Sequence, residues 1–422
     1  MNNTQLALHF FLQLAVVLLV CRVMGSLVAR VGQPRAMAEM LAGILLGPSL
    51  FGLVLPEWQA WLFPWDKAQG TRDTQSYLYP IAQLGLALYM FIVGLEFRVE
   101  TVRKHARAAL AVSIAGIVAP FILGAALAWA CFDTTPFFPK FTTVGQAMLF
   151  LGASMCITAF PVMARIIEAK GIGHTIAGSV AIGAGAINDA AAWCLLAFVL
   201  SSADGDMRRT WLASGGGVGF VMVMFLVVKP LLARHRAWFM EAGDKLGERG
   251  MTLALVLLAL AAWSTEFIGL HAVFGAFILG MVMPRGAICR DLRARIQPLT
   301  VGLLLPLFFT YSGLNTKLSL LDTPYLWFMA LAVLAAAVLG KGVACWLAAR
   351  AFGIGNREAA SIGALMNARG LMELIIINIG LQRGIISEEL FAALALMAVV
   401  TTLMTVPMFD WAMRQAKAMP LA

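Results

Sequence analysis

A buried acid and a helix-breaking proline stand close together in the apolar part of this 422-residue chain. Pro161 interrupts the apolar run 143–169, because proline lacks an N–H donor and clashes with the preceding helical turn. Asp189 follows Asn188 in the next apolar run, 173–201. A carboxylate inside a bilayer is costly and persists where it faces a cavity or a partner. Transporters bind cations at the membrane midplane with such a broken helix beside a buried carboxylate.

The elements that must position these residues are transmembrane helices. Of all residues 61% are hydrophobic and 13% charged, and apolar runs of about 20 residues recur from end to end. No hydrophilic stretch is long enough to fold as a second domain. We therefore predict an all-α polytopic membrane protein with about thirteen transmembrane helices. The predicted spans are 5–29, 35–53, 78–96, 106–131, 143–169, 173–201, 209–233, 248–267, 270–284, 297–314, 324–352, 357–381 and 388–413.

The formal net charge of +9 resides in short loops between the apolar runs. This distribution indicates orientation in a membrane and not a nucleic-acid site. One set of alternate loops, with the C-terminus, holds roughly nineteen basic residues and the other set roughly seven. We therefore expect the N-terminus outside and the C-terminus in the cytoplasm, in a bacterial inner membrane.

Three short motifs recur in the same order about 210 to 240 residues apart. The pairs are 41–48 with 278–284, 91–96 with 309–315, and 158–163 with 367–372. The third pair places helix breaks at Thr158, Ala159, Phe160 and Pro161 in one copy and at Asn367, Ala368 and Gly370 in the other. About six helices would then be repeated, with a seventh as connector, so helix one and helix eight start on opposite faces and the two copies are inverted. Inverted repeats with paired broken helices place the substrate site where the breaks cross.

A lysine lies midway along the apolar run 324–352. Lys341 is too deep to reach water by snorkelling and needs an acceptor. The inverted repeat brings its helix beside the crossing, where Asp189 and Asn188 are the available partners. A purely structural pair between lysine and carboxylate is the alternative interpretation.

Three further charges lie near the two breaks. Arg369 and Glu373 are one helical turn apart and are expected to pair along their helix. Arg165, four residues after Pro161, lies near the related break and is expected to share Glu373. We interpret these three charges mainly as supports for the unwound segments.

A single carboxylate with neutral oxygen neighbours binds either a proton or a cation. Asp189, Asn188 and Thr158, with main-chain carbonyls at the helix breaks, form such a set, and Asp189 and Thr158 are the expected ligands of a monovalent cation. Protonation removes the charge that holds the cation, so the two ligands compete and exchange follows. No nucleotide loop, Cys/His metal spacing or nucleophile–base pair is present, so we expect neither a cofactor nor an enzyme.

Two other functions remain open from the residues alone. A sodium-coupled symporter of an organic anion has a similar crossed-helix fold, but needs basic or hydroxyl groups around a larger pocket. A gated potassium channel would conduct far faster than any exchanger. An intramembrane enzyme ranks third, because no catalytic constellation is present.

Five ordered motifs resemble the plant cation/H+ exchangers and their bacterial Kef-like relatives. They are ITAFPVMARI at 157–166, NDAAAW at 188–193, GLHAVFGAF at 269–277, LPLFFTYSGL at 305–314 and MNARGLMEL at 366–374. The likeness covers nearly the whole chain. It implies the monovalent cation/proton antiporter superfamily, and with it K+ or Na+ exchange for protons by alternating access in cation and pH homeostasis.

The resemblance also implies an architecture. Core-type helices would lie at about 106–201 and 324–413, scaffold helices that form a homodimer at about 5–96 and 248–314, and a linker helix at about 209–233. By the same resemblance Asp189 carries the cation and the proton, Thr158 and Asn367 lie at the crossed breaks, and Lys341 occupies the core lysine position.

Two differences from the family bear on mechanism. Many relatives carry two adjacent aspartates where this chain has Asn188 and Asp189, which favours electroneutral exchange of one proton per cation. Plant exchangers and Kef-type systems carry a long cytoplasmic regulatory region, whereas this chain stops soon after Phe409. We therefore expect no soluble regulatory domain.

Overall fold

The computed structural model describes residues 3–30, 35–64, 73–96, 105–173, 175–204, 207–241, 245–314 and 321–414. Within these ranges the chain is almost entirely helical, and eight helices are long and apolar enough to cross a membrane. The predicted all-α membrane fold is therefore confirmed, and the chain is an integral membrane protein. The number of about thirteen spans stays a prediction, because several helices are too short to cross alone.

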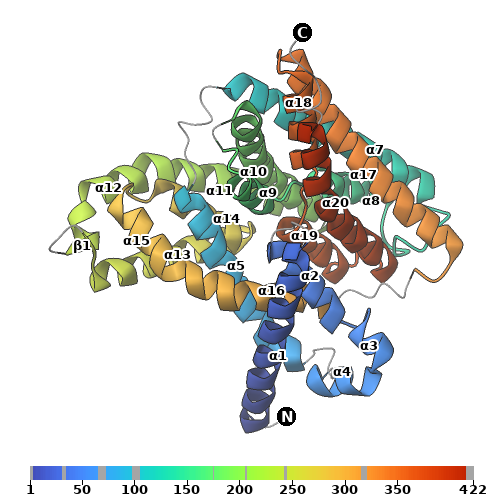
Figure 1. Ribbon diagram of the computed structural model, residues 1–422, viewed down its shortest axis with the longest axis horizontal. Helices are drawn as coiled ribbons and strands as arrows, with labels where there is room; N and C mark the ends of the chain where they lie inside the picture. The colour runs from blue at the N-terminus through green and yellow to red at the C-terminus, as the bar shows by residue number, and fades with distance from the viewer. Residues whose placement is uncertain are drawn as a thin grey trace. The chain divides into compact units, whose positions relative to one another are not determined.

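Two compact units divide the chain (Figure 1). Unit 1 comprises residues 1–20, 55–98 and 200–311, and unit 2 comprises residues 21–54, 99–199 and 312–422. The boundaries fall inside α1 (Asn3–Arg30), α10 (Ile176–Asp204) and α16 (Leu305–Leu314), so each of these helices contributes to both units. The assignment of core and dimerisation roles to helices stays a prediction.

Unit 1 is a set of helices with one small hairpin. Its elements are α4 (Pro56–Leu62), α5 (Asp73–Glu96), α11 (Met207–Val223), a π-helical turn (Met224–Val228), α12 (Lys229–Arg234), a 3-10 turn (Arg236–Phe239), β1 (Met240–Glu241), β2 (Lys245–Leu246), α13 (Glu248–Ile268), α14 (Ala272–Val282), α15 (Ala287–Leu299), a second π-helical turn (Thr300–Leu304) and α16 (Leu305–Leu314). Helices α5 and α14 cross at Gly94 and Gly280, where any larger side chain would overlap the backbone of the other helix.

Unit 2 carries both members of the third predicted motif pair, 158–163 and 367–372. Its elements are α2 (Arg35–Leu46), α3 (Phe51–Val54), α7 (Ala106–Cys131), α8 (Val144–Cys156), α9 (Phe160–Ala169), α10, α17 (Pro324–Ala351), α18 (Asn356–Met366), α19 (Leu371–Gln382) and α20 (Glu388–Arg414). Helices α7 and α17 lie side by side (Figure 1). A Cβ atom on Gly152 of α8 would lie 2.9 Å from the α7 carbonyl oxygen of Phe121, and one on Gly363 of α18 would lie 2.5 Å from the α17 carbonyl oxygen of Gly342. Small residues thus allow both pairs of backbones to approach closely.

Both predicted helix interruptions are present in unit 2. Helix α8 ends at Cys156 and α9 begins at Phe160, while α18 ends at Met366 and α19 begins at Leu371. Pro161 is the second residue of α9, a position where its missing N–H costs no helical hydrogen bond. The proline therefore starts the second half-helix and does not kink a continuous one.

Other boundaries differ from the predicted spans. The span predicted at 297–314 belongs to a helix that begins ten residues earlier, at Ala287, and continues as α15, the second π-helical turn and α16. Helix α15 is amphipathic, and its buried face consists of Ile288, Leu292 and Ile296. Its arginines lower the local hydropathy and hide this first part from a hydropathy argument. The hairpin of β1 and β2 was also not predicted, because two-residue strands have no periodicity.

Candidate cation and proton site

The two helix breaks in unit 2 touch each other directly. The Ala159 N–H donates to the Ala368 carbonyl oxygen at 2.8 Å, and the Thr158 hydroxyl lies 3.5 Å from the Met366 carbonyl oxygen. Backbone groups released by one break are thus satisfied by the other, as buried main-chain polar groups require. The prediction that the breaks cross is therefore met by a main-chain hydrogen bond.

The second break is also held by α20. The Thr402 hydroxyl donates to the Arg369 carbonyl oxygen at 2.6 Å and lies 3.0 Å from the Arg369 N–H. Asn367 is fully buried, and its amide nitrogen donates to the Gly363 carbonyl oxygen at 3.0 Å. Among the described residues its side-chain oxygen has no partner. Asn367 therefore presents one free oxygen at the crossing.

Asp189 lies midway along α10 and is 2% exposed. Neither carboxylate oxygen has a hydrogen-bond partner of good geometry in the described part of the chain. The Phe160 N–H, at the start of α9, and the Lys341 ammonium lie close enough to interact with the carboxylate electrostatically. The positive end of the α9 half-helix thus faces the acid. A buried carboxylate with open oxygens is able to accept a cation or a proton.

Asn188 is fixed by hydrogen bonds at both ends of its amide. The Ser113 hydroxyl of α7 donates to its oxygen at 2.5 Å, and its nitrogen donates to the Thr158 hydroxyl oxygen at 3.1 Å. All three side chains are buried. These two hydrogen bonds link α7, α10 and the first break. They hold the Thr158 oxygen in a defined position beside α10, the helix that carries Asp189.

The partner of Lys341 differs from the predicted one. Its ammonium donates to the carbonyl oxygen of Cys156, the last residue of α8, and not to Asp189 or Asn188. The last carbonyls of a helix lack partners within the helix, and a helix break leaves them buried. A main-chain carbonyl therefore takes the position that a side-chain acceptor was expected to fill.

Arg369 satisfies the two carbonyls that precede Cys156. Its guanidinium donates to the Ser154 carbonyl oxygen at 3.1 Å and to the Met155 carbonyl oxygen at 2.6 Å. It also forms the expected ion pair with Glu373, at 3.1 Å, and both side chains are fully buried. Two buried cations thus cap the C-terminal end of α8. The predicted contact of Arg165 with Glu373 involves a side chain that lies outside the described residues.

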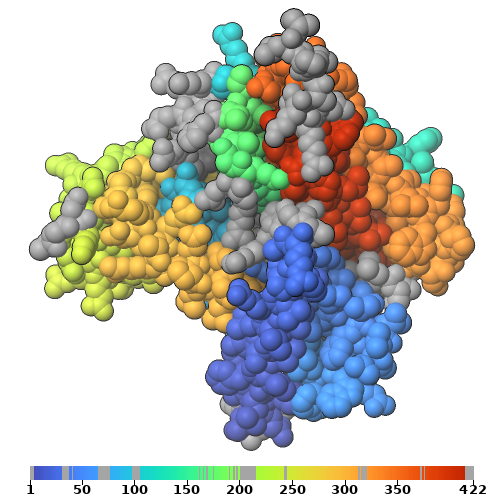
Figure 2. All heavy atoms as spheres, viewed as in Figure 1, coloured from blue at the N-terminus to red at the C-terminus, as the bar shows by residue number. Residues whose placement is uncertain are grey.

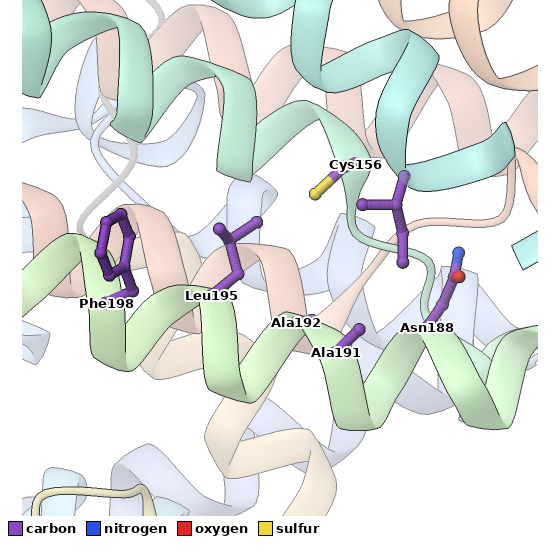
Figure 3. A pocket seen from close by; sticks show the side chains of 7 residues that line it. Cys156, Asn188, Ala191, Ala192, Leu195 and Phe198 are labelled. Carbon is purple, nitrogen blue, oxygen red and sulfur yellow. The ribbon is translucent and has the colours of Figure 1, made fainter. Parts of the chain in front are cut away.

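A cavity of about 350 Å³ leads to the site along α10 (Figure 3). Its lining residues are Ile117, Cys156, Asn188, Ala191, Ala192, Leu195 and Phe198. Asn188 and Cys156 lie at one end, and Phe198, which is 45% exposed, lies further along the helix. The cavity is mainly apolar, and its amide-bearing lining residue is Asn188.

Three supporting residues were missed by the sequence argument: Ser113, Cys156 and Thr402. Ser113 is the sole hydroxyl-bearing residue between positions 106 and 131, and Thr402 stands in an apolar helix. A polar side chain in an apolar span indicates a buried hydrogen bond, and this signal could have identified Ser113 and Thr402. Cys156 acts through its carbonyl oxygen, which every residue has, so no sequence signal identifies it.

Two half-helix pairs that cross beside an open carboxylate define the class of this protein: a secondary transporter with paired broken helices. The chain is 36% identical to the Na(+)/H(+) antiporter NhaS4 of Synechocystis, over 96% of this chain and 97% of the relative. It is 35% identical to Cation/H(+) antiporter 17 of Arabidopsis thaliana, over 94% of this chain and 47% of the relative. The chain therefore spans about half the length of that plant relative.

The fold is similar to that of a solved structure, the sodium proton antiporter MjNhaP1 from Methanocaldococcus jannaschii. The TM-score is 0.67 at 15% identity, over 97% of this chain and 100% of the other. The family model described as "Sodium/hydrogen exchanger, transmembrane" matches residues 15–414. The chain belongs to this family. The resemblance to plant cation/H+ exchangers is thereby confirmed.

Proposed function

We propose that this chain is a secondary antiporter that exchanges Na+ or K+ for protons, with Asp189 as the shared binding group. The observation that carries the proposal is a buried carboxylate whose two oxygens have no hydrogen-bond partner of good geometry among the described residues. Such a group is stabilised when it binds a cation or a proton. Membership of a family whose members are named Na+/H+ and cation/H+ antiporters supports the same function.

Each neighbouring group has a distinct role in this proposal. Asp189 supplies the charge, and the Thr158 hydroxyl, held by Asn188, supplies a neutral oxygen ligand. Asn188 accepts from the Ser113 hydroxyl and donates to the Thr158 hydroxyl oxygen, so its main role in this proposal is to position Thr158, while the second lone pair of its oxygen can still face the ion. The carbonyls of Ser154, Met155 and Cys156 are occupied by buried cations, so we do not count them among the ligands.

Exchange follows from competition at one carboxylate. The protonated acid has no charge with which to hold a cation, and a bound cation displaces the proton. Alternating access then requires that the loaded site face each side of the membrane in turn. No cofactor takes part in this cycle, and the only ligands are the transported ions.

We further propose a homodimer in a bacterial inner membrane, with the N-terminus outside and the C-terminus cytoplasmic. The excess of basic residues in alternate loops supports this orientation. The dimer rests on the family's architecture alone. Mass measurement of the protein in lipid as well as in detergent tests it, and a monomer in both contradicts it.

The test of function is a cation-jump assay in proteoliposomes that contain an internal pH dye. Addition of Na+, K+, Li+ or Rb+ in separate runs is expected to release protons from the lumen with at least one of these ions. Proton movement that needs an added organic anion would instead indicate a symporter. Fluxes far above the turnover that a cycle of alternating access allows would indicate a channel.

A further inference from the structure

One end of unit 1 gathers the ends of several helices. Helices α5, α12 and α14 end there, and α13 and α15 begin there. The Arg285 guanidinium, just after α14, donates to the Leu95 carbonyl oxygen of α5 at 2.5 Å. Arg293 of α15 pairs with Glu96, the last residue of α5, at 2.8 Å. These contacts place the helix ends at one common surface.

The connection from α12 to α13 is folded onto this surface. The β1–β2 hairpin is bound to α15, because the Leu246 N–H donates to the Asp291 carboxylate at 3.0 Å and Arg295 donates to the Leu246 carbonyl oxygen at 2.8 Å. Phe239, at the end of the 3-10 turn, is fully buried and accepts a hydrogen bond from the Gly247 N–H at 3.0 Å. The connection is therefore an ordered platform.

The platform and its surroundings carry six basic side chains open to solvent, here named the basic rim. These are Arg234, Arg236, Lys245, Arg249, Arg290 and Arg295. Within the described residues the only ion pair of the rim joins Arg290 to Asp291, with a separation of 3.8 Å and with Arg290 78% exposed. Two acids, Glu241 and Glu248, are exposed nearby, so the positive charges remain in excess.

An aromatic residue stands within the basic rim. Trp238 is 55% exposed and stacks on His235 with ring centroids 4.2 Å apart. Tryptophan is enriched at the headgroup level of membrane proteins. Gly286 has a φ of +99° at the turn into α15. A Cβ atom placed on this glycine would lie 3.4 Å from the Arg236 guanidinium, so Arg236 packs against the turn. The rim thus joins the 3-10 turn to the start of α15. The yellow-green part of the chain that includes α12 lies beside the yellow-orange α15 (Figures 1 and 2).

We propose that the basic rim binds the phosphate groups of acidic phospholipids, with Trp238 inserted at the headgroup level. Basic residues that only orient the chain during insertion need no fixed arrangement. Here a hairpin and a 3-10 turn hold them in place at the ends of membrane-spanning helices, where lipid headgroups lie. Clustered lysines and arginines at this depth attract anionic lipids of the cytoplasmic leaflet.

The experiment measures which lipids the full-length chain retains. Protein is taken from vesicles of phosphatidylcholine in which about a third is replaced by phosphatidylglycerol, and bound lipids are counted by native mass spectrometry. The variant R236Q/K245Q removes two rim charges. The control K140Q/R383Q removes two exposed charges from connections that the predicted topology assigns to the opposite side. Thermal unfolding checks that each variant is folded.

Wild type and control are expected to retain phosphatidylglycerol severalfold above its share of the vesicle, and R236Q/K245Q is expected to retain it at close to that share. The preference is also expected to fall at high salt, because ions screen exposed charges.

If R236Q/K245Q does not fold, R249Q/R290Q serves as the second test of the rim. Equal retention by a folded rim variant and by wild type would overturn the proposal. Displacement of phosphatidylglycerol by millimolar inorganic phosphate would overturn its lipid part in favour of a soluble anion. Neither outcome depends on cation transport.

Discussion

Asp189 differs from the other buried charged side chains around the crossing. Neither of its carboxylate oxygens has a hydrogen-bond partner of good geometry in the described part of the chain. Lys341 and Arg369 donate to carbonyl oxygens, and Glu373 accepts from Arg369. Charges held by hydrogen bonds of good geometry act as structural supports, whereas a carboxylate without such bonds is available to a ligand. The geometry therefore separates the supporting charges of the site from the one that binds.

Substitution of Asp189 by asparagine is expected to reduce cation/proton exchange below about a tenth of wild type. The amide keeps the shape of the side chain but carries no charge and takes up no proton at neutral pH. Stability is expected to be preserved, because neither carboxylate oxygen holds a described part of the fold by a hydrogen bond of good geometry. Dye-based exchange in proteoliposomes and thermal unfolding in detergent measure the two effects.

Asp410→Asn is the matched control for this substitution. Asp410 also lies in unit 2, but it is partly exposed and pairs with Lys170 at 2.7 Å. An exposed pair contributes about 0–1 kcal/mol, so this variant should transport like wild type. If Asp189→Asn and Asp410→Asn transport equally well, Asp189 is not the carrier.

The apparent affinity for the cation is expected to weaken as the pH falls. Protons and cations compete for Asp189, so a higher proton concentration requires more cation for half-maximal exchange. Measured at several pH values, the cation concentration for half-maximal rate should rise toward acidic pH while the rate at saturation changes less. An affinity that is flat over the whole range argues against a shared site.

At the scale of elements, the C-terminal end of α8 depends on two cations from the other half of unit 2. Arg369→Met leaves the carbonyls of Ser154 and Met155 without their donor and leaves Glu373 buried without a counter-charge. Breaking a buried pair in this way costs about 3–5 kcal/mol. A clear drop in the thermal unfolding midpoint is expected, whereas Arg350→Met, which removes an exposed donor to the Ile354 carbonyl oxygen, should change it little.

The double variant Arg369→Met/Glu373→Met distinguishes the two contributions to that loss. It removes the uncompensated carboxylate but still leaves the α8 carbonyls without a donor. Replacing both partners of a buried pair by apolar residues costs much less than removing one. The double variant should therefore unfold at a higher temperature than Arg369→Met. A double variant that is no more stable means that the carbonyl contacts, and not the ion pair, account for the loss.

The sequence predicted the elements that violate the rules of an apolar interior. Pro161 and Asp189 are costly inside a bilayer helix, and this cost made both visible. The alignment with Asn367 then located the second break, which the structure places at residues 367–370, between α18 and α19. Residues that are energetically unfavourable at their position in a membrane helix can thus be recognised from the sequence.

The partners of those residues were harder to predict. Lys341 binds a carbonyl oxygen of Cys156 that a helix break exposes, and main-chain atoms leave no mark in a sequence. Ser113 reaches Asn188 through the packing of α7 on the rest of unit 2, a contact that spans 75 residues. The start of α15 was misplaced because its arginines mask an amphipathic helix. Tertiary contacts decide all three cases.

For the whole molecule, the net charge moved in one transport cycle depends on how many groups titrate. Asn188 cannot take up a proton, and its amide is occupied by Ser113 and Thr158. Lys341 is the other group close to Asp189, and its ammonium is held by the Cys156 carbonyl oxygen. A lysine that is satisfied by a carbonyl oxygen has no need to release its proton when a cation arrives. We therefore expect Asp189 alone to carry one charge in each direction.

Exchange is accordingly expected to be electroneutral, at one proton per cation. Each net charge moved across about 100 mV would contribute about 2.3 kcal/mol, so an electrogenic cycle would respond strongly to voltage. The measurement is Na+ or Li+ uptake into liposomes under a potential set by valinomycin and a K+ gradient. Wild type should show no uptake driven by voltage alone.

Asn188→Asp supplies the contrast, because a second titratable carboxylate beside Asp189 allows two protons to exchange for one cation and should make uptake voltage-dependent. Voltage-driven uptake by wild type that is lost in Lys341→Met would instead identify Lys341 as a second proton carrier.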